Sequence, residues 1–135
     1  MTIHPPINFT QIELAPGHKR GLTLTSPFIA ESGCWGFSDE YSKTIKMGLL
    51  GSMITNPISA YPRHPSRGVQ IREVNPGEAL HTGLPNPGIR KALLKFGKKW
   101  SNFSCPIIVH LAVENPDEVN ECIYQLEEQD NVIGI

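Results

Sequence analysis

The chain has 135 residues, of which 39% are hydrophobic and 19% charged, a balance typical of one globular domain. Its formal net charge of −1 gives no electrostatic reason to bind nucleic acid or an anionic membrane, so neither is expected as a partner. The sequence has no long apolar run and no signal-peptide pattern at its start, so we expect a cytoplasmic protein.

The first half of the chain predicts short strands and one helix. Residues 7–14 and 21–26 alternate apolar and polar side chains around a Pro-Gly turn, which predicts a hairpin. Residues 27–32 predict a short buried strand, and 51–56 predict the next one. Between them, 39–50 begins with two acidic residues and repeats apolar residues at helical spacing, which predicts a helix. The apolar face of that helix would comprise Tyr41, Ile45 and Leu49.

The second half alternates helices with strands after a long connection. Residues 57–82 show no strong period, and a loop of that length in a compact domain is usually functional. Helices are predicted over 86–100 and 115–129, and apolar strands over 106–113 and 131–135. The expected caps and first helical residues are Asn86 with Pro87, and Asn115 with Pro116. The expected inward-facing residues are Ile89, Leu93, Phe96, Trp100, Val119, Ile123 and Leu126, and the expected solvated ones are Arg90, Lys91, Lys95, Lys98 and Lys99.

The cysteine and histidine residues are not spaced as in a metal site. Cys34, Cys105 and Cys122 are odd in number and lack C-x-x-C spacing, which is typical of reduced thiols. We expect Cys105 and Cys122 to be structural. None of the five histidines has a second ligand at zinc spacing, so no metal is expected.

Strands that alternate with helices predict a parallel α/β architecture in a single domain, 1–135. On this pattern alone, a doubly wound sheet and a TIM barrel both remain open. No G-x-G-x-x-G or Walker pattern is present, which disfavours a dinucleotide or nucleotide triphosphate fold.

Three segments carry a family resemblance. "SPFIAESGCWGFSDEY" (26–41), "GSMITNPIS" (51–59) and "GLPNPGI" (83–89) together resemble the first half of class 1 dihydroorotate dehydrogenases, which are cytosolic, FMN-dependent TIM barrels of pyrimidine synthesis. "PIIVHLAVENPDEV" (106–119) is similar to the third strand and helix of that family. The resemblance implies the N-terminal half of a TIM barrel, with a floor hairpin in 1–26 and about three and a half β/α units in 27–135.

The resemblance also implies where ligands would bind. FMN would contact the first βα loop and the end of the second strand, namely Ala30, Glu31, Ser32, Gly33 and Asn56. Backbone N–H groups of Thr82, Gly83 and Leu84 would bind the carboxylate of a small substrate, and Leu80 would occupy the position that faces its ring. The alternative is that Gly83–Gly88 is a rigid turn that caps the following helix.

Departures from the family pattern define the competing interpretations. Family members usually carry a lysine at Asn56, an asparagine at Leu80 and a small residue at Glu31, so dihydroorotate itself is not expected to be a good substrate. A TIM barrel typically needs about 250 residues. The resemblance places the catalytic loop and the phosphate loops outside this sequence, so we expect no catalytic residue here and an inactive isolated chain.

Three interpretations therefore stand. The chain is the first half of an FMN-dependent dehydrogenase acting on CH–CH bonds, or a non-catalytic half-barrel subunit or scaffold, or part of an FMN enzyme for another substrate with the remainder supplied by a second chain. A homo-oligomer or a complementary half-barrel is the expected partner in each case.

Overall fold

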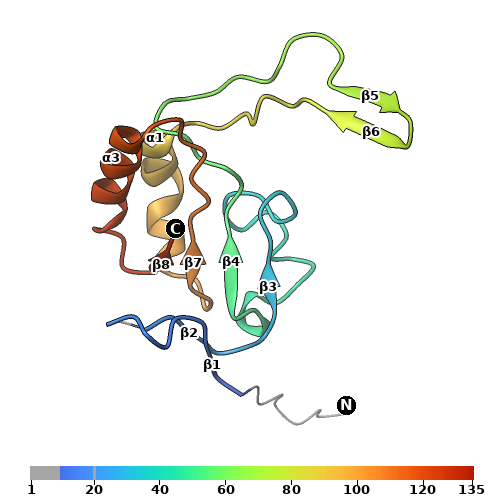
Figure 1. Cartoon of the computed structure of the whole chain (residues 1–135). Helices are drawn as coiled ribbons and strands as arrows, with labels where there is room; N and C mark the ends of the chain where they lie inside the picture. Colours follow the sequence, from blue (N-terminus) through green and yellow to red (C-terminus); the bar gives the residue numbers. More distant parts are fainter. Residues whose placement is uncertain (1–9, 20) are drawn as a thin grey trace.

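The computed structural model describes residues 10–19 and 21–135 (Figure 1). The first part of the predicted strand 7–14 lies outside the described residues. Within them, β1 (Ile12–Glu13) pairs antiparallel with β2 (Thr23–Leu24), in a register that sets Ile12 opposite Leu24. The predicted hairpin is thus confirmed, with shorter strands than expected.

Four parallel strands form the central sheet, in the order β3-β4-β7-β8. They are β3 (Ile29–Ala30), β4 (Ser52–Ile54), β7 (Ile107–Ile108) and β8 (Val132–Gly134). The parallel α/β architecture predicted from the sequence is confirmed. Within the described residues the sheet is open, with β3 and β8 as its edges, so the predicted 27–32 strand is an edge strand rather than a buried one.

One continuous helical segment and one regular helix cover a single face of this sheet (Figure 1). The segment consists of α1 (Ile89–Ala92), a π-helical turn (Leu93–Gly97) and α2 (Lys98–Trp100). The regular helix is α3 (Pro116–Leu126), and Asn115 caps it as predicted by accepting a hydrogen bond from Glu118 N. The helices face the sheet with their apolar sides because burial of those sides is what stabilises short helices in water.

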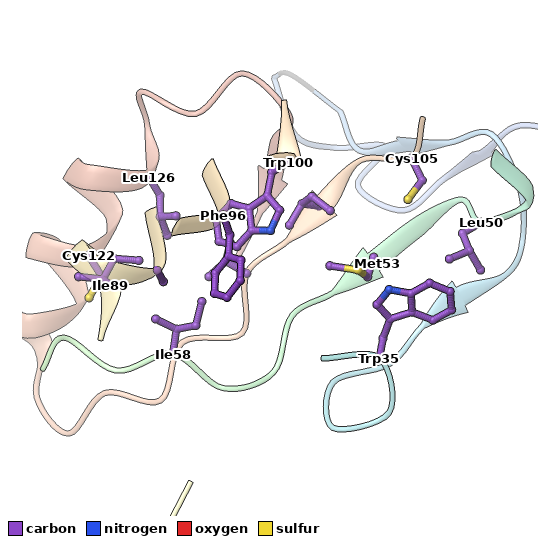
Figure 2. Close-up of a cluster of buried hydrophobic side chains, with 13 residues drawn as sticks. Trp35, Leu50, Met53, Ile58, Ile89, Phe96, Trp100, Cys105, Cys122 and Leu126 are labelled. Atoms are coloured by element: carbon purple, nitrogen blue, oxygen red, sulfur yellow. The ribbon is translucent and has the colours of Figure 1, made fainter. Parts of the chain in front are cut away.

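The core lies between the helices and the sheet (Figure 2). Met53, Ile107 and Val109 are fully buried against the helices, whereas Ile54 and Ile108 point to the opposite face and are half-buried. Val109 therefore belongs to the core, whereas the two isoleucines lie on the other face of the sheet. The structure confirms burial of Ile89, Phe96, Trp100, Cys105, Cys122 and Leu126, and burial raises the pKa of the Cys105 thiol to about 11.

The prediction of a helix over residues 39–50 is wrong. The carboxylate of Glu40 accepts hydrogen bonds from the backbone N–H groups of Phe37 and Ser38, and the residues after it form turns, with Ser42 N donating to Asp39 O and Thr44 N to Tyr41 O. Regular structure returns only as a 3₁₀ turn at Met47–Leu49. The expected apolar face stays exposed, with Tyr41 at 51%, so there was no buried surface to stabilise a helix.

The 57–82 segment contains a second hairpin that the sequence analysis missed. Strands β5 (Ile71–Val74) and β6 (Gly77–Leu80) pair antiparallel and project from the molecule (Figure 1). We call residues 71–80 the arm. At its base, Ser66 N donates to Thr82 O and His81 N donates to Gln70 O.

The start of the 86–100 helix also differs from expectation. Gly88, with φ of +76°, occupies the N-cap position, and Asn86 uses its side chain elsewhere. The exposed basic side and the buried apolar side of this helical segment are confirmed, with Leu93 half-buried. No helix among residues 10–19 and 21–135 is long and apolar enough to span a membrane.

Candidate functional site

The carboxyl ends of β3, β4, β7 and β8 meet at one edge of the sheet, around a hollow of about 670 Å³. In open parallel sheets this edge is where ligands usually bind. Glu31 and Ser32 follow β3, His110 follows β7 and Ile135 follows β8, while Ile54 and Ile108 form the apolar wall. The hollow therefore combines an apolar surface with a few polar groups, as small-molecule sites do.

Gly33 and Asn56 join the first two loops of this edge. Gly33 N donates a 3.0 Å hydrogen bond to Asn56 Oδ1. Gly33 has φ of +91°, a backbone conformation that glycine adopts without strain, and a Cβ built there would meet no heavy atom within 4 Å. Bare backbone thus faces open space beside Asn56.

Ser32 and His110 join the first and third loops. Ser32 Oγ and His110 Nδ1 share a hydrogen bond of 2.7 Å, and His110 N donates to Thr55 Oγ1. His110 was not among the site residues predicted from the sequence, although it is the polar residue that interrupts the apolar run 106–113. That change from apolar to polar at a strand end was the signal that could have found it.

Glu31 and Cys34 form a second, exposed pair in the same loop. Cys34 Sγ donates to Glu31 Oε1 at 3.3 Å, and this hydrogen bond, reinforced by the carboxylate charge, raises the pKa of the thiol above its usual 9.0. Cys34 is therefore disfavoured as a thiolate nucleophile. Glu31 itself is exposed and lines the hollow at its rim.

A second hollow, of about 690 Å³, lies beside the open edge of the sheet at β3. It is lined mainly by apolar residues, among them Phe28, Ile29, Tyr41, Ile45 and Leu49. Ala30 lines this hollow rather than the one that Ser32 and His110 line, and Glu31 lines both. Of the predicted flavin contacts in the first loop, Ala30 and Glu31 thus line the hollow beside β3, and Ala30 lines only that one.

The turn at Thr82–Leu84, which was predicted to bind the substrate, contains two residues with positive φ. Gly83 has φ of +77° and Leu84, a residue with a side chain, has φ of +48°. Glycine adopts such a value without strain, but for Leu84 it costs free energy and persists only where surrounding contacts enforce it. Leu84 N donates to Thr82 Oγ1, so that amide is already occupied, whereas the amides of Thr82 and Gly83 find no acceptor in the described part of the chain.

The remainder of the same turn docks onto residues 59–66. Asn86 Oδ1 accepts hydrogen bonds from Ser59 N, Ser59 Oγ and Gly88 N, and its Nδ2 donates to Leu84 O. A Cβ on Gly88 would lie 2.8 Å from Pro62 N. The two glycines and the asparagine thus serve a tight packing of backbone on backbone, beyond a helix cap.

The structure separates the predicted substrate residues from the first hollow. Leu80 lies on β6 of the arm, is 66% exposed and pairs across the strands with Ile71. Leu80 and Thr82–Leu84 are not among the residues that line the hollow at Ser32 and His110. No group of three or more His, Cys, Asp or Glu side chains is placed to hold a metal ion within 10–19 and 21–135.

The chain has a parallel α/β sheet, with a glycine-containing loop and polar side chains at the carboxyl ends of its strands. These features define the class of α/β proteins that bind ligands at this edge of the sheet. The sequence matches the family described as dihydroorotate dehydrogenase over residues 18–135, so the chain belongs to that family.

Curated relatives agree with this family. The chain is 32% identical over 113 residues to the Bacillus pumilus protein named dihydroorotate dehydrogenase B (NAD(+)), catalytic subunit, covering 83% of this chain and 36% of that protein. Proteins of the same name from Desulforudis audaxviator and Bacillus thuringiensis are 32% and 29% identical, over 73% and 93% of this chain and 32% and 39% of their own lengths. The chain therefore spans about a third of the length of the curated relatives that it matches.

Proposed function

We propose that this chain forms the first part of a dihydroorotate dehydrogenase-like oxidoreductase, folded as a TIM barrel and dependent on FMN. The observation that supports the proposal is the arrangement at the carboxyl edge of the sheet. Ser32 and His110 share a hydrogen bond and line the hollow with Ile54 and Ile108, and Gly33, which follows Ser32, is hydrogen-bonded to Asn56 outside that lining. Active sites of TIM barrels lie at this edge.

The residues present fit a flat aromatic ring. Open space in front of Gly33 lets such a ring approach the backbone, and Ile54 and Ile108 offer apolar surface nearby. When bound, FMN would supply the group that accepts a hydride from a CH–CH bond. The chain's own residues would bind and orient that ring.

Asn56 and His110 would keep the first loop in the shape that binds the ring. Asn56 Oδ1 holds the Gly33 amide, and His110 holds Ser32, so the loop is tied to β4 and to β7 at once. Preorganised loops of this kind reduce the ordering cost of binding. Ala30 and Glu31 would border the ring from the β3 side.

The proposed partner and substrate are inferred from the names of the relatives. Those proteins are named as catalytic subunits of dihydroorotate dehydrogenases that use NAD(+), so we infer a partner subunit and a small carboxylate-bearing substrate. The cytoplasmic location expected from the sequence is part of the same proposal. The substrate carboxylate would bind the amides at Thr82 and Gly83. A complementary portion of barrel would close the sheet between β8 and β3.

A second candidate is a non-catalytic half-barrel subunit. The observation in its favour is that Leu80 lies on an exposed arm, so the position implied for substrate contact has no polar group and no enclosure in the described chain. FMN binding without turnover, or no FMN binding, by a protein that contains the complete barrel would favour this candidate over the first.

The test is titration of the chain with FMN, followed by quenching of flavin fluorescence. We expect colourless purified protein, because the phosphate loops implied by the resemblance are not in this sequence, and weak but saturable quenching when FMN is added. The change Gly33→Ala should weaken binding about tenfold, because its methyl group would take the space of the ring.

Gly68→Ala is the matched control for that substitution. Gly68 also has a positive φ, of +85°, and open space around its missing Cβ, but it lies at the base of the arm. Equal binding by wild-type protein and both variants would contradict a flavin site at Gly33, and absent binding by the wild-type chain would contradict FMN recognition by this half.

A further inference from the structure

The backbone of His110 is held on both sides by the segment that continues β4. Its N–H donates to Thr55 Oγ1 at 3.2 Å, and its carbonyl oxygen accepts a hydrogen bond of 2.8 Å from Ile58 N. Thr55 and Ile58 are both fully buried. The imidazole of His110 therefore extends from a fixed backbone into the hollow that it lines with Ser32.

The imidazole uses one of its two nitrogens within the described part of the chain. Nδ1 shares the 2.7 Å hydrogen bond with Ser32 Oγ, whereas Nε2 of His110 has no hydrogen-bond partner there. Side chains alternate along a strand, so His110 points to the same face of the sheet as Ile108, which forms the apolar wall. A flat ring against this wall would have the histidine at its border.

Among the described residues that line the hollow, His110 is the one that can carry a positive charge. Apart from Glu31, Ser32 and His110, every lining residue is apolar, including those from β4 and β8. Glu31 lies at the rim and accepts a hydrogen bond from the thiol of Cys34. The charge of the hollow therefore depends on whether the imidazole is protonated.

The acidic groups on the α3 side have partners of their own. Glu114 is in the ion pair with Arg63, and Glu118 accepts a hydrogen bond from the side chain of Asn115 at the start of α3. Asp117 is exposed and lies outside the lining of the hollow. None of these three carboxylates is bonded to the imidazole.

Protonation would change what the Ser32–His110 pair offers to a ligand. In either neutral tautomer the pair has one hydrogen-bond donor left after its internal bond, Nε2–H of the imidazole or the serine hydroxyl. The protonated imidazole donates from both nitrogens, so Ser32 Oγ accepts and its own hydrogen can turn toward the hollow. The protonated pair thus presents two donors and a positive charge, an arrangement that favours anions.

Reduction of a flavin ring creates such an anion. The neutral oxidised ring takes up two electrons and one proton, and one negative charge remains. We propose that the protonated Ser32–His110 pair makes the hollow bind reduced FMN more tightly than oxidised FMN. The inference rests on the proposed function, since FMN must bind at this edge of the sheet. Because binding and protonation are linked, the preference should fade as the pH rises above the range in which histidine is protonated.

Anaerobic ultrafiltration of the chain with oxidised FMN, or with FMN reduced by dithionite, measures the two dissociation constants. At pH 7 the wild-type chain should bind reduced FMN about tenfold more tightly, which corresponds to a rise of about 30 mV in the midpoint potential of the bound flavin. At pH 9 the two constants should agree to within about twofold. The carboxylate of the terminal residue, Ile135, is common to all the proteins compared, so its charge does not enter the differences.

Substitutions of His110 separate its charge from its shape. Glutamine cannot be protonated, so His110→Gln should bind both forms of FMN equally to within about twofold at pH 7. Lysine stays charged to about pH 10, so His110→Lys should keep the preference at pH 9. Ser32→Ala should lower the preference about threefold at pH 7, because one donor is lost. His81→Gln is the matched control and should behave as the wild type, since His81 is exposed and lies outside the hollow.

The ratio of the two constants distinguishes this inference from the proposed function. If His110→Gln weakens binding of both forms alike and keeps their ratio, His110 has only a structural role, which would overturn the inference and leave the flavin site intact. A wild-type preference that persists unchanged at pH 9 would overturn it as well. If the wild-type chain binds neither form, the flavin site and the preference are both contradicted.

Discussion

The side chain of Asn86 forms hydrogen bonds with several backbone groups in and around the turn before α1. It is 7% exposed, and its amide bonds Ser59, Gly88 and Leu84. Replacing it by alanine leaves buried amide and carbonyl groups without partners, which costs about 1–3 kcal/mol for each such group. We expect Asn86→Ala to lower the free energy of unfolding by roughly 3 kcal/mol in a urea titration.

Asn102→Ala is the comparison for that substitution. Asn102 is exposed and its Nδ2 donates to Lys98 O, so its loss should cost little. Equal effects of the two substitutions would show that the bonds of Asn86 do not hold the turn. Asn86→Asp separates the accepted hydrogen bonds from the donated one, because a carboxylate can accept from Ser59 and Gly88 but cannot donate to Leu84 O.

At the scale of single residues, the sequence identified the glycines at which the backbone can approach another group closely, but not the groups that it contacts. Gly83 and Gly88 stood out by residue type, and a glycine before a helix is compatible with either a cap or a close approach. Their partners, Ser66 and Pro62, come from the connection 57–82, which had no recognisable pattern. His110 had one local signal, the change from apolar to polar at a strand end, but its partner Ser32 is 78 residues away in the sequence and is brought to it only by the fold.

The N-terminal hairpin depends on one carboxylate. Glu13 accepts hydrogen bonds from Leu22 N, Thr23 Oγ1 and Ala15 N, and these bonds lower its pKa below the usual 4.5. A lowered pKa in the folded state means that the contribution is fully present above about pH 4.5 and is lost as the pH falls through the folded pKa. The hairpin should therefore loosen on acidification while the sheet persists.

Amide exchange at Leu22, followed by NMR as a function of pH, measures this loosening. In the wild type, protection should fall below pH 4.5, the usual value of the glutamate carboxyl. Glu13→Gln should reduce protection already at neutral pH and remove its dependence on acid. Glu127→Gln, on an exposed residue after α3, serves as control. Unchanged protection at Leu22 in the Glu13 variant would refute the role of the carboxylate.

At the scale of elements, strong periodic patterns gave correct predictions and weak ones did not. The four parallel strands and α3 were predicted because their apolar residues are buried by the fold, as at Ile107 and Leu126. The 39–50 pattern was equally periodic, but its apolar face has no surface to cover in the described chain. The arm carried a signal that was overlooked, the Pro-Gly turn between "IREV" and "EAL".

The whole molecule exposes much apolar surface on the side of β3. Ile45 and Leu49 are 43% and 42% exposed beside the second hollow. Exposed patches of this kind drive association, and an edge strand adds unpaired backbone groups. We expect the isolated chain to bind the dye ANS and to aggregate. Ile45→Lys with Leu49→Lys should reduce both without loss of stability.

Leu14→Lys is the control, because Leu14 is 48% exposed but lies in the N-terminal hairpin. If it reduces dye binding as much as the double change does, the patch at β3 is not the source. A sharp thermal transition of a strict monomer that binds no ANS would contradict the argument altogether and indicate a self-contained domain.

The order of the strands has a consequence for synthesis on the ribosome. The central strand β4 pairs with β3, which precedes it, but its other neighbour is β7, and the whole arm and the helical segment 89–100 lie between them in the sequence. Met53 and Ile58 therefore leave the ribosome well before Ile107 and Trp100 arrive to bury them. During that interval the nascent chain presents a strand with one unpaired edge and apolar side chains, the kind of segment that chaperones bind.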